Sequence, residues 1–312
     1  MKYVLIVLEI NDEWNKMPKW KQAFMQYIYY PVLGYDKLKT GSITLCTGDI
    51  LTVYSVPGPI LESKKCKDFL SKTAEEFDIH FLPHEDDYNI LKEDRCKSFV
   101  RLMYWKQMVD DVRKKYVINE DNMHIAITAD NDSVFLRKML DDLKYCGRFF
   151  SIRMNECHVE FLRFANDFIA DNGIDLNVST RFDKKIDCDV LIELGSNKCA
   201  LLPRQSKVIR LFHASPLVTR RIVVEQLEVE GLKVDGYTEE DIKLFNYILE
   251  KIGYYTVVVL MLYLKSATMG RNKLKSILSA ENEYDVLGEY DFVESCSAVL
   301  KASGITFSKC SI

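Results

Sequence analysis

Short β-rich runs alternate with helical stripes between residues 123 and 212, and this alternation constrains the fold more than any other feature of the sequence. Apolar residues at i, i+3, i+4 and i+7 predict two helices, around Leu136–Leu143 and Phe161–Ile169, which end at Gly147 and Gly173. Strands are predicted at 123–128, 149–152, 176–178, 190–194 and 208–212. Strand and helix in this order require right-handed crossovers, so the sequence predicts a parallel sheet.

This pattern divides the chain into three predicted segments. Residues 119–214 are expected to form a Rossmann-like, doubly wound domain of the α/β class. Residues 1–118 are expected to form a smaller mixed α/β domain, with a strand at 3–8, a helix that Pro18 opens and a hairpin whose turn contains Gly48. Residues 215–312 read as a mainly helical region, with a helix from Ser215 to Leu227 and a terminal strand at 305–307.

Charge and cysteine content limit the partners and the cellular compartment that can be expected. The 42 basic residues are outnumbered by 46 acidic ones, for a net charge of −4, which disfavours a nucleic-acid partner. The nine cysteines are an odd number and contain no Cys-x-x-Cys pair, so structural zinc and a disulfide framework are both disfavoured. We therefore expect reduced thiols and a cytoplasmic location.

Two apolar runs could suggest a membrane or a secretion signal. The N-terminal run is followed by Glu9, Asp12 and Glu13, where a signal peptide would have small residues. The second run, 254–264, is about half the length that crosses a bilayer. On this basis no membrane partner is expected, while a homo-oligomer is left open.

A ligand is expected at the carboxyl ends of the parallel strands, as in other doubly wound sheets. The loop after the first strand of this domain reads Ala129-Asp130-Asn131-Asp132-Ser133 and has no glycine. The domain resembles the dinucleotide-binding class in fold, but that class needs a glycine-rich loop to approach a pyrophosphate, and two carboxylates would repel it. The nucleotide loop is therefore degenerate, and NAD(P) is not expected to bind.

The same loop supports other interpretations. Asp130-x-Asp132-x-Val134 resembles the D-x-D-x-[TV] motif of haloacid-dehalogenase-like phosphatases, which implies Asp130 as nucleophile, Asp132 as general acid, and magnesium. The later strand has only Glu193 where that family has an acidic pair. Sugar-nucleotide transferases also hold a metal with a D-x-D, but normally after a longer nucleotide-binding region. The plainest interpretation is an N-cap, in which Asn131 or Asp132 accepts the free amides of the next helix.

Basic residues gather near the end of the domain, and an anionic ligand would suit them. This cluster comprises Arg204, Lys207, Arg210, Arg220 and Arg221, with His213 between them. A solvated surface explains the same pattern. The candidate ligand-binding residues are Asp130, Asp132, Ser133, Arg153 and His213.

The sequence favours a binding or interaction module for a small anionic ligand, and it identifies no cofactor. The alternatives are a metal-assisted phosphoryl-transfer enzyme that uses the D-x-D loop and an atypical NAD(P)-dependent oxidoreductase.

Overall fold

The computed structural model describes most of the chain and resolves it into two compact units. The described residues are 1–45, 48–83, 88, 91, 93–119, 122–195, 202, 205–212, 222–224, 226–230, 239–280, 282–303 and 306–311. The first unit contains Met1–Glu93 and Leu232–Lys265, and the second contains Asp94–Gly231 and Ser266–Ile312. Each unit thus combines two stretches of chain, whereas the sequence analysis divided the chain into three consecutive segments. Whether those three segments are separate domains stays a prediction.

The first unit contains a four-stranded mixed sheet in the order β2-β3-β1-β4. Its strands are β1 (Tyr3–Ile10), β2 (Lys39–Thr44), β3 (Ile50–Pro57) and β4 (Ile79–Phe81). The predicted hairpin is confirmed, because β2 pairs with β3 in antiparallel register and Gly48 has a φ of +79°. Strands β3 and β4 both pair with β1 in parallel register.

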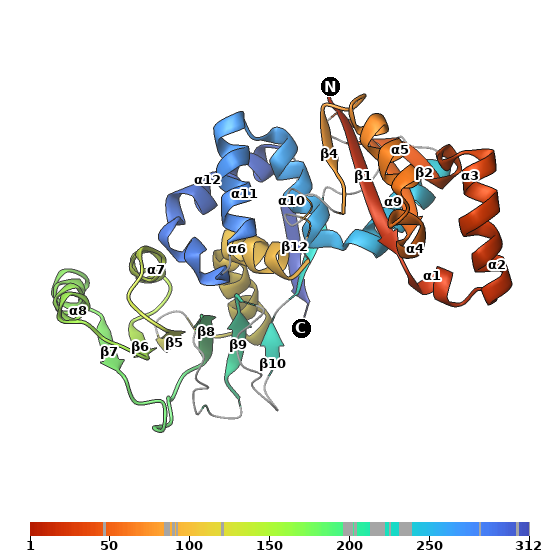
Figure 1. Cartoon of the computed structure of the whole chain (residues 1–312). Helices are drawn as coiled ribbons and strands as arrows, with labels where there is room; N and C mark the ends of the chain where they lie inside the picture. Colours follow the sequence, from red (N-terminus) through yellow and green to blue (C-terminus); the bar gives the residue numbers. More distant parts are fainter. Residues whose placement is uncertain are drawn as a thin grey trace. The chain divides into compact units, whose positions relative to one another are not determined.

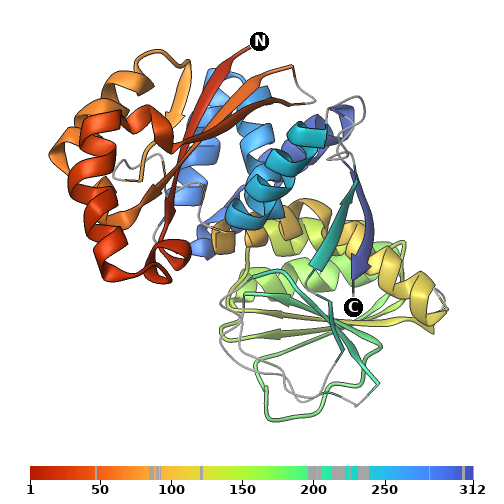
Figure 2. The same cartoon turned by 90° about the vertical axis from the view of Figure 1, so that its right-hand side faces the viewer.

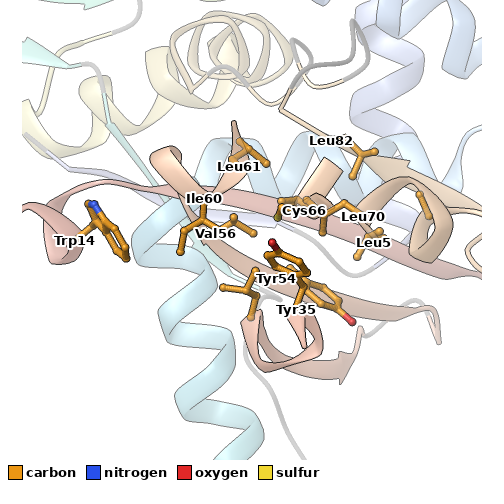
Figure 3. Close-up of a cluster of buried hydrophobic side chains, with 13 residues drawn as sticks. Leu5, Trp14, Tyr35, Tyr54, Val56, Ile60, Leu61, Cys66, Leu70 and Leu82 are labelled. Atoms are coloured by element: carbon orange, nitrogen blue, oxygen red, sulfur yellow. The ribbon is translucent and has the colours of Figure 1, made fainter. Parts of the chain in front are cut away.

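The core of this unit explains why β1 reads as an unbroken apolar run. On one face of the sheet, Leu5 and Val7 join a buried cluster with Tyr54, Cys66 and Leu70, which Figure 3 shows between the sheet and the helices that cover it. The alternate β1 residues are equally buried on the other face. A strand that is covered on both sides loses the polar alternation of a half-exposed strand.

Helices and helical turns make up most of the rest of the first unit. They are α1 (Asp12–Asn15), α2 (Lys19–Phe24), the π-helical turn η1 (Met25–Tyr29), α3 (Tyr30–Leu33), η2 (Tyr35–Leu38), α4 (Gly58–Leu61), α5 (Lys64–Ala74), α9 (Glu239–Ile252) and α10 (Tyr254–Lys265). Within the described residues, no single helix has the length and apolar composition to cross a bilayer. Ile242–Ile252 and Tyr254–Lys265 satisfy both criteria only when taken together, and they meet at an angle of 105°.

The second unit contains the predicted parallel sheet. All neighbouring strands pair in parallel, in the order β10-β9-β8-β5-β6-β7. The strands are β5 (His124–Ala129), β6 (Phe149–Met154), β7 (Asp175–Ser179), β8 (Val190–Leu194), β9 (Lys207–Arg210) and β10 (Ile222–Val224). This is the strand order of the Rossmann fold, in which the chain reverses direction across the sheet between its first and fourth strands. The predicted fold class is therefore confirmed.

Different kinds of structure cover the two faces of this sheet (Figures 1 and 2). Helices α7 (Val134–Leu143) and α8 (Val159–Asn172) lie on one face, as the crossovers β5–α7–β6 and β6–α8–β7 require. The opposite face is covered by coil, because Ile186, Cys188 and Leu202 pack on Ala126, Leu191 and Val208. We call it the coil-covered face.

The remaining helices of the second unit include a long kinked one. They are α6 (Glu93–Tyr116), which kinks at Tyr104, α11 (Thr268–Ser279), the 3₁₀ turn η5 (Glu283–Gly288) and α12 (Tyr290–Ala302). The unit also has a two-stranded antiparallel sheet, formed by β11 (Gln226–Glu230) and the C-terminal β12 (Thr306–Ser311).

Two local predictions were wrong. The helix expected from Ser215 to Leu227 is replaced, where the structure describes it, by strands at 222–224 and 226–230, which is consistent with the β-branched residues there. Gly147 does not cap the first predicted helix, which ends at Leu143 with Lys144 as its C-cap. A Cβ at Gly147 would lie 2.8 Å from the Met123 carbonyl oxygen, so this glycine permits a close backbone approach. Gly173 is the expected left-handed cap of α8.

Candidate functional site

A row of polar side chains crosses the coil-covered face near the carboxyl ends of its strands. Strand register aligns Arg153 with Thr128, Thr128 with Glu193, and Glu193 with Arg210. Since side chains alternate across a strand, all four project from the same face. All four are buried. Polar groups that are buried in this way mark the row as a chemically distinctive part of the domain.

Two members of the row form a buried ion pair. The Nε of Arg210 donates to Glu193 Oε2 at 3.2 Å, and both side chains are almost wholly inaccessible to solvent. The carboxylate therefore balances the Arg210 guanidinium where water cannot. Because the two charges balance each other, Glu193 and Arg210 have a structural role in the sheet.

Arg153 differs from Arg210 because it has no ion-pair partner among the described residues. Its side chain is only 7% exposed, and Nη1 donates to the Asn177 side chain at 3.2 Å and to the Ile152 carbonyl at 3.3 Å. Its Nε is buried without a hydrogen-bond partner. Burial lowers the pKa of the guanidinium, and Cys188 only partly opposes this effect. A buried guanidinium without a carboxylate in ion-pair contact has no negative charge to balance its own.

A cavity of about 250 Å³ lies beside Arg153 on the same face. Its charged and polar lining residues are His124, Ser151, Arg153, Asp175, Asn177, Lys185 and Asp187. His124 Nε2 and Ser151 Oγ are 2.9 Å apart and hydrogen-bonded. Burial lowers the pKa of His124 more than the nearby carboxylates raise it, so the ring stays neutral near pH 7. The cavity therefore combines two cations, two carboxylates and several neutral hydrogen-bonding groups.

The candidate residues in the loop after β5 are engaged in contacts within the protein. Asp130 accepts a hydrogen bond from the Asn155 side chain, and Asp132 forms an ion pair with Arg137 in which Arg137 Nε lies 2.9 Å from Oδ1. Ser133 is the N-cap of α7, because its Oγ accepts from the Leu136 amide at 3.1 Å. The predicted N-cap is therefore present, but the capping residue is Ser133, whereas the sequence analysis named Asn131 or Asp132.

These contacts predict unequal effects for two substitutions in the loop. Ser133→Ala should lower the free energy of unfolding by about 1 kcal/mol, since it removes the cap of a helix amide. Asp132→Asn should cost about 0–1 kcal/mol, because it weakens only a partly exposed ion pair. Urea denaturation of both variants checks the order of the two effects. A larger loss for Asp132→Asn would contradict the assignment of the cap.

The crevice in which related folds hold a ligand is filled at the end of β8. Gly195, with a φ of +77°, follows this strand, and a Cβ placed on it would lie 2.7 Å from the Tyr284 ring. The same ring packs on Phe212 just beyond β9, with centroids 4.8 Å apart. An aromatic side chain thus occupies part of the space over the reversal point of the sheet. His213, which was also assigned to this edge, lies outside the described residues.

The structure brings only part of the predicted site together. Asp130, Asp132 and Ser133 lie in one loop, whereas the Arg153 side chain lies in the cavity on the coil-covered face. Of the basic cluster, Arg210 pairs with Glu193, and Lys207 Nζ lies 4.3 Å from the Tyr116 ring centroid. Arg204, Arg220 and Arg221 are not among the described residues. Within the part of the chain that the structure describes, no group of three or more His, Cys, Asp or Glu side chains is arranged to hold a metal.

Sequence reasoning missed most residues of the cavity. Apart from Arg153, it did not name His124, Asp175, Asn177, Lys185 or Asp187 as candidate ligand-binding residues. A usable signal was present, because, apart from Phe149, every second residue of β5, β6 and β7 on one face is polar or small. That face would normally carry crossover helices, and only the structure shows that coil replaces them.

Comparisons with known proteins add no family. No protein-family model matches the chain, and no curated protein matches its sequence. Among solved structures, the chain is similar to a chorismate mutase/shikimate 5-dehydrogenase fusion protein from Clostridium acetobutylicum, with 10% identity over 97% of this chain and 98% of that chain. The TM-score is 0.25, which carries no argument about function. The Rossmann-like assignment therefore rests on strand order and parallel pairing.

Proposed function

We propose that this chain is a binding module for a small anionic ligand, which it holds in the cavity on the coil-covered face. The observation that carries the proposal is the state of Arg153. Arg153 is 7% exposed, lines the cavity and has no carboxylate in ion-pair contact among the described residues. A ligand carboxylate or phosphate would supply the missing charge and accept from its fork of N–H groups.

The other lining residues limit the chemistry of the ligand. Lys185 adds a second cation, while Asp175 and Asp187 can accept hydrogen bonds from hydroxyl or ammonium groups. The volume of about 250 Å³ lies just below the usual range for small-molecule sites. These features favour a compact organic anion that also has hydrogen-bond donors, such as a hydroxy acid, an amino acid or a small sugar phosphate.

The two enzymatic alternatives receive no specific support from the described residues. Asp130 and Asp132 already have partners within the protein, since they contact Asn155 and Arg137 respectively. A dinucleotide would meet the glycine-free loop and the Tyr284 ring at the end of β8. We therefore propose a role in ligand binding.

The test is a thermal-shift and calorimetric screen of the full chain with inorganic phosphate, glycerol phosphate, malate and aspartate. A ligand at about 100 times its Kd should stabilise the native state by about 2.7 kcal/mol. Arg153→Met should abolish this stabilisation, while Arg163→Met, at an exposed position of α8, should retain it. Without ligand, Arg153→Met should unfold no more easily than the wild type, because it removes a buried charge that lacks an ionic partner.

Two outcomes would refute the proposal. One is a screen in which no compact anion shifts the melting temperature. The other is ligand stabilisation that survives in Arg153→Met, which would place the binding site elsewhere.

A further inference from the structure

The helical run from α2 through η1 to α3 exposes an apolar stripe to solvent. Five large side chains form this outer stripe, and they are 72%, 44%, 71%, 52% and 73% exposed in chain order: Trp20, Phe24, Tyr27, Ile28 and Val32. Trp20, Phe24, Ile28 and Val32 recur every four residues, which is close to one turn in both the α-helical and the π-helical parts of the run. They therefore lie along one face, and Tyr27 precedes Ile28 in the sequence. A contiguous face of this kind marks an interaction site, whereas scattered apolar side chains do not.

Polar and apolar contacts fix the opposite side of the run to the first unit. Gln22 Nε2 donates to the carbonyls of Trp14 and Met17 at 2.9 Å, and Gln26 Nε2 donates to the Pro59 carbonyl at 3.2 Å. Met25 and Tyr30 pack against the buried cluster of Figure 3. These contacts hold the inner face of the run against the first unit, so the outer stripe faces solvent.

The charge around the stripe is positive. Lys16, Lys19 and Lys21 are all exposed, and the sequence from Trp14 to Tyr35 contains no aspartate or glutamate. The whole chain, in contrast, has a net charge of −4. Lys19, the first residue of α2, also opposes the helix dipole, so helix stability does not explain its placement.

We infer that the outer stripe and its lysines dock the protein on an anionic lipid surface. Trp and Tyr favour the interface between water and hydrocarbon, and lysines near an apolar face bind acidic headgroups. The expectation of no membrane partner followed from the absence of a spanning segment, but this helix would lie in the interface and would not span. A second copy of the chain fits less well, because the stripe would bring three lysines from each copy together with no carboxylate in the segment to balance them.

The tryptophans make the docking directly measurable. Of the three in the chain, Trp14 and Trp105 are buried and only Trp20 is exposed. Full-length protein is mixed with vesicles of phosphatidylcholine alone and of phosphatidylcholine with phosphatidylserine. Only the anionic vesicles should cosediment the protein, shift its tryptophan emission to the blue and protect it from iodide quenching. Added salt should reverse the binding.

Matched variants separate the two parts of the surface. Lys19→Gln with Lys21→Gln should weaken binding about thirtyfold, since each basic residue near an anionic surface contributes a factor of about five. Phe24→Ser with Ile28→Ser should abolish the emission shift. Tyr145→Ser with Met269→Ser, at positions that are 80% and 86% exposed in the second unit, should leave both signals unchanged.

Each remaining outcome overturns the inference. No cosedimentation with anionic vesicles excludes a lipid surface as the partner. Equal binding to both vesicle types would show that attraction between the lysines and acidic headgroups does not contribute to docking. Sedimentation that shows a dimer, which Phe24→Ser with Ile28→Ser dissociates, assigns the stripe to self-association instead.

Discussion

Glu193→Gln should destabilise the protein by about 3–5 kcal/mol, one of the largest effects expected of any substitution in the sheet. Its carboxylate receives a hydrogen bond from Arg210 Nε at 3.2 Å, and both side chains are buried. Loss of one partner leaves the other charge in a medium that solvates it poorly, and that penalty exceeds the attraction that was lost. Guanidinium denaturation measures the effect, and Trp105 fluorescence, read in a chain with Trp14 and Trp20 changed to Phe, reports the second unit alone.

An exposed ion pair provides the matched control. Lys273 Nζ lies 2.5 Å from Glu289 Oε2, but both side chains are well exposed, so Glu289→Gln should cost about 0–1 kcal/mol. Replacing both Glu193 and Arg210 by Met should recover much of the lost stability, because no buried charge then remains at either position. If Glu193→Gln and Glu289→Gln have the same effect, the burial of the Glu193–Arg210 pair has no energetic consequence.

The sequence was sufficient for most strands of the two larger sheets, because these strands carry the burial pattern directly. Val190 to Leu194 is buried on both faces, and a run of this length that is apolar apart from Glu193 predicts a strand of a covered parallel sheet. The sequence analysis missed strand β10 because the local signals there favoured a helix. Its three residues, Ile222–Val224, lie inside a β-branched stretch that Ser215-Pro216 made look like the start of a helix.

The site was harder to predict than the fold because its location depends on what covers the sheet. The rule that ligands bind at the carboxyl edge directed attention to Asp130 and Asp132. In the structure, the cavity instead runs from His124, at the start of β5, to Arg153, near the end of β6. The connection from β7 to β8 contains no helix, and no local pattern reveals where such a segment leaves space over a sheet.

The outer stripe shows a similar limit. Trp20, Phe24 and Ile28 recur at helical spacing, and this periodicity predicts a helix with an apolar face. Periodicity does not state whether that face meets the core. Here Gln22 and Gln26 lie on the inner side and hydrogen-bond to backbone carbonyls, so the apolar face meets solvent.

Gly195→Ala should lower the free energy of unfolding by about 2–6 kcal/mol. A φ of +77° costs a non-glycine residue about 1–3 kcal/mol. The new methyl group would also lie 2.7 Å from Cδ1 of Tyr284, and relief of such overpacking costs about 1–3 kcal/mol more. The measurement is guanidinium denaturation in the same single-tryptophan background.

Gly173→Ala separates the two contributions, because Gly173 has a φ of +62° and nothing within 4 Å of an added Cβ. It should show the backbone cost alone, so the difference between the two variants reports the contact with Tyr284. In Gly195→Ala with Tyr284→Ala, the packing part should disappear, and the double-mutant cycle should give a coupling of about 1–3 kcal/mol. Additive effects would mean that the ring does not press on Gly195. The end of β8 would then be open to a ligand, which would revive the crevice as a binding site in competition with the cavity beside Arg153.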